Sequence, residues 1–230
     1  MNKNNRIWEI DFLRGTAIIL MALFHLFYDL KEFYGYNFEY QTGIIYYMGK
    51  LSALMFIMLT GISCSFSKNN LKRGIRALFY ALIITIVTYI YDPNTYVNFG
   101  ILHFLATCII LYKFFRPLNN LSLFSLGTLI ILTGYIINQF SVSSNIIVPF
   151  GLTSNNYTSL DYYPLFPYLG VFLYGIAMKR FLYPANKSLL NPSLNFKTIS
   201  YLGKHSLFIY LVHQPIILGA LKMLRLMDLI

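Results

Sequence analysis

The amino-acid sequence predicts an all-α fold: a polytopic integral membrane bundle of about seven transmembrane helices, with the N-terminus on the cytoplasmic side. Of its 230 residues, 57% are hydrophobic and only 11% are charged. A soluble domain carries roughly 25% charged residues, so this composition cannot cover a water-exposed surface. The net charge of +10 would suggest nucleic-acid binding in a soluble protein. Here the apolar content instead favours a membrane protein with basic cytoplasmic loops and no nucleic-acid partner.

Seven stretches are apolar and long enough to cross a bilayer, which needs about 20 residues. They are 10–30, 42–66, 75–91, 99–116, 121–140, 162–181 and 204–224. The third is the shortest and the weakest of them as a span. The first is not a cleavable signal peptide, because it lacks a small-residue cleavage site and contains His25 and Asp29. The chain is predicted to form one domain, 1–230.

Lysine and arginine residues set the orientation. Fourteen of the 18 lie in the N-terminal segment and in the second, fourth and sixth connections, and four lie on the other side. Cytoplasmic loops carry the positive excess. The N-terminus, with Lys3 and Arg6, is therefore predicted to be cytoplasmic, and the loop 141–161, which has no Lys or Arg, to lie outside. A bacterial plasma membrane is the expected location.

The first span contains an unusual set of polar residues. Ionisable side chains inside a span are costly, which makes each one a functional hypothesis. At about 100° per residue, the eleven steps from Arg14 to His25 end within about 20° of three full turns, so the two share one stripe and lie about 16 Å apart along the axis. Asp29, one turn beyond His25, could accept a hydrogen bond from one imidazole nitrogen and leave the other as a base.

A long activated donor would fit this stripe, with its phosphates near Arg14 and its reactive end near His25. The alternative is that Arg14 only snorkels to the lipid headgroups and that His25 and Asp29 satisfy each other between helices. For the stripe as a whole we favour function, because polar groups this deep rarely lack a role.

The segment 6–30, RIWEIDFLRGTAIILMALFHLFYDL, resembles the first helix of the transmembrane acyltransferases. The closer resemblance is to the heparan-alpha-glucosaminide N-acetyltransferase catalytic-domain family and its small bacterial relatives. The spacing Arg14-x10-His25 alone would be a weak signal, but IDFLRG before it and FYDL after it make it specific. Three further segments resemble the same family: FGILHFLA (99–106), DYYPLFPYLGVFLYGIAMKR (161–180) and LGKHSLFIYLVHQPI (202–216).

This resemblance implies transfer of an acetyl group from acetyl-CoA to a hydroxyl or amine, usually on a sugar, across the membrane. It implies that His25 is the essential histidine and Arg14 its partner. The chain is expected to lack the large extracytoplasmic domain and some spans of the animal enzyme, so the glucosamine substrate is not carried over. The expected partners are the lipid bilayer, acetyl-CoA and a sugar or glycan-like acceptor. No metal is expected, and a homodimer is left open.

Two further groups are candidates for the site. His103 begins the fourth span and is predicted to lie in the same leaflet as His25, as a second base or an oxyanion donor, or equally as an interfacial histidine bonded to the backbone. Arg73 and Arg76, in the second loop, are positive-inside anchors that could also hold a phosphate of CoA near the cytoplasmic entrance.

At the outer side, Asp161 and Tyr163 precede the sixth span. Tyrosine is enriched at membrane interfaces for reasons unrelated to catalysis, so a contact of these two residues with the acceptor depends mostly on the resemblance. Lys50, inside the second span, could snorkel or meet a phosphate or carboxylate. His213, in the seventh span, is predicted to be a packing residue more often than a catalyst.

The small residues in the spans have structural interpretations. Cys64 and Cys108 lie in apolar stretches, which favours packing over acyl transfer or a disulfide. Four glycines fit close helix approach better than a phosphate loop: Gly15, Gly61, Gly170 and Gly175.

A non-catalytic membrane protein is the alternative, either a small-solute transporter or an acyl-CoA-binding relative. A transporter would be expected to contain paired spans broken by glycine or proline in matching halves. Here only Pro167 and Pro215 lie well inside spans, which argues weakly for the enzyme.

Overall fold

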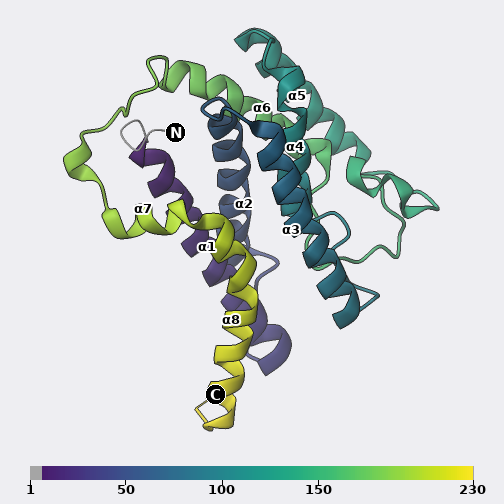
Figure 1. Ribbon diagram of the computed structural model, residues 1–230. Coiled ribbons are helices and arrows are strands. Elements are labelled where there is room, and N and C mark those ends of the chain that lie inside the picture. The colour runs from purple at the N-terminus through teal and green to yellow at the C-terminus, as the bar shows by residue number, and fades with distance from the viewer. Residues whose placement is uncertain (1–6, 230) are drawn as a thin grey trace. The chain divides into compact units, whose positions relative to one another are not determined.

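The protein is helical at every predicted span (Figure 1). The structure is a computed structural model that describes residues 7–229, so Lys3 and Arg6 lie outside the described residues. Helices make up 72% of it, and no β-strand occurs among the described residues. The helices that correspond to the seven spans are α1 (Trp8–Tyr34), α2 (Gly43–Cys64), α3 (Asn70–Tyr91), α4 (Ile101–Phe115), α5 (Asn120–Ile137), α6 (Leu165–Leu182) and α8 (Ser206–Leu226). The predicted all-α membrane fold is confirmed.

Six of these helices are long and apolar enough to cross a membrane, and α4, with 15 residues, is shorter. The expectation that the third span is the shortest is therefore wrong. Helix α3 has 22 residues because Asn69 caps it: the Asn69 side chain accepts a hydrogen bond from the Lys72 backbone N–H at 2.9 Å. The residues Arg73 and Arg76, expected in a loop, consequently lie in the first turns of α3.

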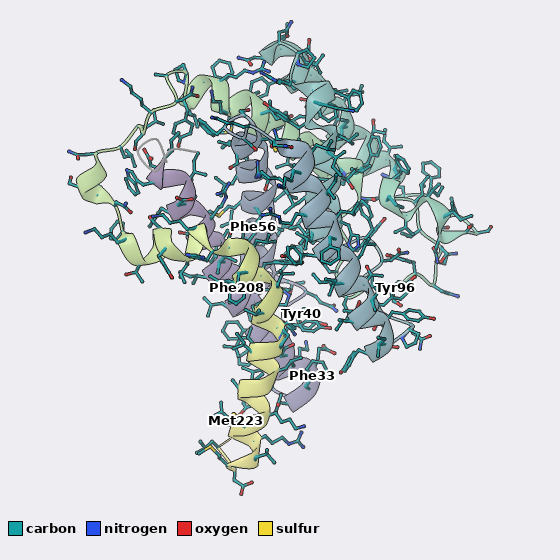
Figure 2. The ribbon with its side chains drawn as sticks, viewed as in Figure 1. Phe33, Tyr40, Phe56, Tyr96, Phe208 and Met223 are labelled. Atoms are coloured by element: carbon teal, nitrogen blue, oxygen red, sulfur yellow. The ribbon has the colours of Figure 1, made fainter. Side chains whose placement is uncertain are left out.

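The outer surfaces of the helices are apolar. On α8, Phe208 is 66% exposed and Met223 is 67% exposed, and both project from the helix in Figure 2. Water would disfavour so much exposed apolar area, whereas lipid chains cover it at no cost. The helices therefore lie in a lipid bilayer.

Contacts divide the described residues into two compact units. The central unit comprises Ile57–Asn186, and the terminal unit comprises the described residues up to Phe56 together with those from Lys187 onward. Helix α2 contributes its first part to the terminal unit and its last part to the central unit. Each unit is described by itself, and a single domain over 1–230 stays a prediction.

The terminal unit contains α1, α8, the first part of α2 and a short helix that the sequence did not predict, α7 (Lys197–Lys204). In Figure 1, α7 runs across the direction of α8. It packs on the first turns of α1 at two glycines. A Cβ at Gly203 would overlap the Asp11 carbonyl oxygen, and one at Gly15 would overlap the Ile199 carbonyl oxygen.

The segment before α7 is fixed to the start of α1 by one carboxylate. Glu9 Oε1 accepts hydrogen bonds from the Ser188 hydroxyl at 2.6 Å and from the Leu189 and Leu190 backbone N–H groups at 2.7 Å each. Bonds between a charged acceptor and neutral donors are the strong ones. This loop is therefore held against α1 rather than left as a plain connection.

The central unit is built from α3 packed on α4 and α5 packed on α6. Close approaches at glycine recur here: a Cβ at Gly61 would overlap Phe172 O, one at Gly175 would overlap Met58 O, and one at Gly170 would overlap Gly127 O. Together with Gly15, this confirms the prediction that these four glycines serve helix packing. Both cysteines, Cys64 and Cys108, are buried.

The loop predicted to lie outside is ordered. It contains a short 3-10 helix, η2 (Asn145–Phe150), and its last residues run beside the segment before α4. Leu160 N–H donates to Thr95 O at 2.8 Å, and Tyr163 N–H donates to Phe99 O at 3.0 Å. These backbone bonds hold the start of α6 next to the start of α4.

Candidate functional site in the terminal unit

Two histidines of the terminal unit face each other. The His25 ring on α1 and the His213 ring on α8 have centroids 4.7 Å apart and planes at 84°, an edge-to-face arrangement. Both side chains are partly buried. The sequence predicted His25 as a site residue and His213 as a packing residue; the structure brings the two into contact.

Hydrogen bonds set the tautomer of each ring. His25 Nδ1 lies 2.9 Å from Met21 O, and His213 Nδ1 lies 2.6 Å from Tyr210 O. A carbonyl oxygen can only accept, so each Nδ1 carries a proton, and in the neutral ring each Nε2 has a lone pair. His213 Nε2 is buried and has no hydrogen-bond partner among residues 7–229. The pair therefore presents two nitrogens that can take a proton.

Asp29 has a different partner from the predicted one. Its side chain is 0% exposed, and both carboxylate oxygens accept from Gln214 Nε2, at 2.8 and 3.0 Å. The expected bond between His25 and Asp29 is replaced, because the Met21 carbonyl takes the His25 Nδ1–H and α8 brings an amide to the carboxylate. Asp29 therefore ties α1 to α8 directly beside the histidine pair.

Gln214 contributes a second buried atom that could accept a hydrogen bond. Its Oε1 is buried and has no hydrogen-bond partner in the described part of the chain. Buried polar atoms are normally satisfied, and an exception calls for a ligand, a water or a functional explanation. The unsatisfied Gln214 Oε1 and His213 Nε2 lie on consecutive residues of α8, which makes this stretch a candidate binding site.

Arg14 lies eleven residues before His25 on α1, a rise of about 16 Å. Its Nη1 is 3.6 Å from Asp11 Oδ1, and the Arg14 side chain is 20% exposed while that of Asp11 is 3% exposed. Between Arg14 and His25, Ile18 and Met21 on the same stripe are buried. The predicted stripe therefore begins at an arginine with a neighbouring carboxylate and ends at the histidine pair.

His103 belongs to the central unit, and there it joins α3 to α4. The Thr85 hydroxyl donates to Val97 O at 2.8 Å, so its oxygen accepts from His103 Nε2, which lies 3.1 Å away. The His103 side chain is 5% exposed. The His103 ring thus bonds to a side-chain hydroxyl rather than to the backbone carbonyl of the alternative interpretation, and a catalytic role for His103 stays a prediction.

Asp161 also has a structural partner. Its Oδ2 accepts from the backbone N–H of Ile101, the first residue of α4, at 2.8 Å. A carboxylate at a helix N-terminus is stabilising because it meets unpaired N–H groups and the positive end of the helix dipole. Gly100 makes room for it, since a Cβ there would overlap the carboxylate. A contact between Asp161 and an acceptor stays a prediction.

The tyrosines beside Asp161 form a small aromatic group. The Tyr163 ring lies 4.9 Å from that of Tyr168, and the Tyr157 ring lies 5.2 Å from that of Tyr162. The Tyr162 hydroxyl donates to Val148 O at 2.8 Å, and burial raises the pKa of Tyr162 above its ordinary value. Tyr163 is therefore part of a packed surface at the start of α6, and its predicted contact with the acceptor stays a prediction.

Of the two arginines predicted near the cytoplasmic entrance, Arg73 donates through Nη1 to Asn70 Oδ1 at 3.0 Å, one turn back on α3. Arg73 and Arg76 belong to the central unit, whereas Arg14 belongs to the terminal unit. Their contact with a phosphate of the donor stays a prediction. Among residues 7–229, no group of three or more His, Cys, Asp or Glu side chains could hold a metal ion.

Sequence reasoning missed the partnership of His213 and Gln214 with α1. A signal for it was present, because a histidine and a glutamine inside an apolar span are as costly as the residues of the first span. The same rule, applied evenly to both spans, would have selected them. Their partners could not be read from spacing, because α1 and α8 are almost 200 residues apart in the chain.

A pair of histidines and a buried carboxylate–amide pair, set among membrane-spanning helices, form a candidate site whose groups can hold and move a proton. The chain belongs to the family described as heparan-alpha-glucosaminide N-acetyltransferase, catalytic, whose model matches residues 6–215. This is a family of transmembrane acetyltransferases, and the resemblance seen in the sequence is confirmed. Comparisons with curated proteins and with solved structures give no match.

Proposed function

We propose that the protein transfers an acetyl group from acetyl-CoA, entering from the cytoplasm, to a hydroxyl or amine of a sugar-like acceptor on the opposite side of the membrane. The observation that carries the proposal is the contact between His25 and His213, each with a lone pair on Nε2. Membership of an acetyltransferase family supports the same chemistry.

Arg14 is the proposed contact for the donor's phosphates. Guanidinium groups suit phosphate because they donate two parallel hydrogen bonds and stay charged. Asp11, 3.6 Å away, would hold the guanidinium in position. The rise of about 16 Å from Arg14 to His25 is then covered by the pantetheine arm, which would bring the thioester to the histidine pair. Arg73 and Arg76 would contribute a second set of cations at the entrance.

The proposed reaction conserves atoms and protons. His25 Nε2 takes the proton of the acceptor O–H or N–H as that atom attacks the thioester carbonyl, and the C–S bond then breaks. The thiolate of CoA leaves with the electron pair and receives the proton from His25. The products are the acetylated acceptor and CoA, and the imidazole returns to its starting form.

His213 and Asp29 support this step in different ways. The His213 Nε2 can accept a hydrogen bond from the acceptor group or share the proton held by His25. Asp29 fixes α8 against α1 through Gln214, which keeps the two rings in contact. Preorganisation of this kind lowers the barrier because the groups need not be ordered during the reaction.

Direct transfer and a ping-pong route differ in a measurable way. In the ping-pong route His25 Nε2 itself attacks the thioester, and an acetyl-imidazole forms before the acceptor enters. Radiolabelled acetyl-CoA given without acceptor would label His25 in that route and would leave the protein unlabelled in direct transfer. The same sample, after addition of acceptor, tests whether the label moves on.

The first test is donor binding. The chain has a single tryptophan, Trp8, at the start of α1 and six residues before Arg14, so its fluorescence reports on this end of the stripe. Purified protein in detergent is titrated with acetyl-CoA beside Arg14→Ala. We expect tight binding by the wild type and a loss of about 10- to 100-fold in the variant, the size of a charged hydrogen bond.

The second test separates an enzyme from a transporter. An acetyltransferase that binds acetyl-CoA is expected to hydrolyse it slowly without acceptor, and His25→Ala should abolish this hydrolysis. A protein that neither binds nor hydrolyses acetyl-CoA would contradict the proposal, and transport assays would then follow. Full activity of the folded His25→Ala variant would contradict the assignment of the base.

A further inference from the structure

The segment 187–205 of the terminal unit, which lies between α6 and α8 and contains α7, is basic throughout. Its three lysines are all exposed: Lys187, Lys197 and Lys204. The chain has no Asp or Glu between Asp161 and Asp228, and no ion pair of these lysines occurs among residues 7–229. Cations gathered on one segment without acidic partners create a local field that attracts anions.

The same basic segment also exposes large apolar side chains. Each of them is between 52% and 63% exposed: Leu189, Leu190, Leu194, Phe196 and Tyr201. Water disfavours exposed leucine and phenylalanine side chains. A segment that combines them with lysines suits the membrane–water interface, because the apolar groups reach the acyl chains while the amines reach the headgroups.

Contacts with the first turns of α1 fix the level of the basic segment. Glu9 Oε1 accepts hydrogen bonds from backbone N–H groups at its start. Further along, the Phe196 ring lies 5.5 Å from the Phe12 ring. A Cβ at Gly203 would overlap the Asp11 carbonyl oxygen, so α7 lies directly beside α1 (Figure 1). The segment is therefore level with the end of α1 that is predicted to be cytoplasmic, where the headgroups lie.

The cations of α7 lie on the side of the helix that faces away from α1. At about 100° per residue, Tyr201 and Lys204 lie within about 40° of Lys197 around the helix axis. Gly203, which contacts α1, lies about 100–160° from each of these three residues. Lys197, Tyr201 and Lys204 are all exposed. Two amines with a tyrosine between them are thus directed at whatever surrounds the terminal unit.

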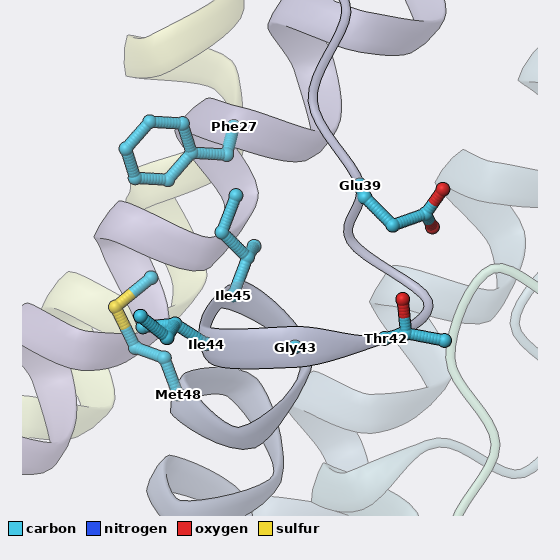
Figure 3. Close-up of a pocket in the computed structure, with 7 residues that line it drawn as sticks. All are labelled: Phe27, Glu39, Thr42, Gly43, Ile44, Ile45 and Met48. Atoms are coloured by element: carbon cyan, nitrogen blue, oxygen red, sulfur yellow. The ribbon is translucent and has the colours of Figure 1, made fainter.

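A pocket elsewhere in the terminal unit has the opposite chemical character. It has a volume of about 610 Å³ and is lined by one carboxylate and several apolar side chains (Figure 3): Glu39, Phe27, Ile44, Ile45 and Met48. Its lining residues include no lysine or arginine. Phe27 is 19 residues after Trp8 on α1, so the pocket lies about 28 Å from the start of that helix. Of these two surfaces, only the basic segment fits an anionic headgroup.

We infer that the basic segment 187–205 is a docking surface for anionic phospholipids of the predicted cytoplasmic leaflet. Lys187, Lys197 and Lys204 bind the headgroup phosphates, and the exposed leucine and phenylalanine side chains reach the acyl chains. Bound lipid would hold the segment, and with it the start of α1, at the membrane surface. The inference goes beyond acetyl transfer and does not depend on it.

The single tryptophan of the chain, Trp8, provides the readout, because it directly precedes the Glu9 that holds the basic segment. The full chain is reconstituted in phosphatidylcholine vesicles that contain a minor fraction of phosphatidylglycerol. Bromine atoms on acyl chains quench tryptophan fluorescence on contact. Quenching is compared when the phosphatidylglycerol is brominated and when an equal amount of the phosphatidylcholine is brominated instead. We expect a preference for phosphatidylglycerol on the order of 100-fold, since each lysine contributes about fivefold.

Two triple variants locate the preference. The combination of Lys187→Gln, Lys197→Gln and Lys204→Gln should abolish it, and arginine at the same three positions should keep it. The matched control changes three exposed lysines of the central unit that are predicted on the same side of the membrane: Lys68→Gln, Lys72→Gln and Lys113→Gln. It removes the same charge, so the preference should persist. Equal loss in both glutamine variants would indicate a general field and would overturn the inference.

Two further measurements use the wild-type protein and need no variant to fold. Sodium chloride at about 1 M, where the Debye length is about 3 Å, should weaken the preference strongly; an unchanged preference would overturn the inference. Added acetyl-CoA should leave the preference intact. If acetyl-CoA instead displaces phosphatidylglycerol and binds more weakly to the variant without Lys187, Lys197 and Lys204, these lysines serve a soluble phosphate ligand and the inference fails. A preference that persists without any acetyl transfer supports the inference and leaves only the proposed function in question.

Discussion

The two units treat their buried polar side chains differently. In the central unit several of them bond to the backbone: the Thr85 hydroxyl to Val97 O, the Asp161 carboxylate to Ile101 N, and the Ser159 hydroxyl to Tyr96 O. In the terminal unit, Asp29 and Gln214 bond across helices, and the buried His213 Nε2 has no hydrogen-bond partner among the residues that the structure describes. Buried polar groups that form hydrogen bonds help to specify a fold. A buried polar group that lacks a hydrogen-bond partner destabilises the protein unless a ligand provides one.

The contrast is not complete, because the Tyr157 hydroxyl of the central unit is also buried without a partner. Even so, among the histidines of the described residues, only His25 and His213 have rings in contact with each other. The comparison therefore favours the terminal unit over the central unit as the place to test for chemistry. The predictions below test this division.

The largest effect is expected from the base. His25→Ala should lower acetyl transfer by about 10²- to 10⁴-fold, the usual contribution of a positioned general base. His103→Ala, the matched histidine of the central unit, should lower it less and should lower the melting temperature more, because it removes the donor to Thr85. Steady-state rates and thermal unfolding of the two purified variants provide the comparison. Equal losses of rate in the two variants would contradict the hypothesis that the chemistry lies in the terminal unit and not in the central unit.

The carboxylate–amide pair should be coupled. Gln214→Leu leaves the buried Asp29 carboxylate without its amide donor, and we expect the free energy of unfolding to fall by about 1–3 kcal/mol. Adding Asp29→Leu should recover much of the loss, since removal of both partners leaves no unsatisfied group. Thermal unfolding in detergent measures all three variants. Simply additive losses would show that the two side chains do not depend on each other.

Packing of α7 on α1 should tolerate no added methyl group. Gly203→Ala would place a Cβ on the Asp11 carbonyl oxygen, and such overpacking costs about 1–3 kcal/mol. Gly219→Ala on α8 is the control, because no atom of the described residues outside the adjacent turns of α8 lies within 4 Å of its Cβ position; alanine there should be neutral or stabilising by up to about 1 kcal/mol. Similar melting temperatures for both variants would contradict the close approach of α7.

The smallest effect concerns Asp161, and it separates the helix cap from the acceptor contact. Asp161→Ala removes the acceptor of the Ile101 N–H and should destabilise the protein by about 0.5–2 kcal/mol. If Asp161 acts only on the fold, the KM for acceptor per folded protein stays constant. A raised KM at an unchanged melting temperature would support the acceptor contact predicted from the sequence instead.

Much of the architecture was readable from local patterns. All seven spans correspond to helices, because a helix satisfies its own backbone and a span therefore needs only apolar length. The stripe from Arg14 to His25 followed from helical periodicity alone. The start predicted for α3, residue 75, was wrong. The apolar stretch begins only after the basic first turns, whereas the helix itself begins at Asn70, directly after its Asn69 cap.

The short helix α7 was missed for a related reason. It is amphipathic and has eight residues, too short and too polar to register as a span. Its position depends on Gly203 and Gly15, whose close contacts with α1 join residues far apart in the sequence. A glycine in a sequence allows a close contact between helices, but the sequence alone does not identify which helix makes that contact.

The sequence by itself determined the fold class, the family and the residue His25 as the base to test, because composition, periodicity and a local motif are properties of neighbouring residues. Only the tertiary structure determined which side chains are the partners of His25 and Asp29. It gave His25 a second histidine and gave Asp29 an amide in place of the imidazole. These pairings depend on which helices pack together, and helix packing is fixed by contacts between residues that the sequence keeps far apart.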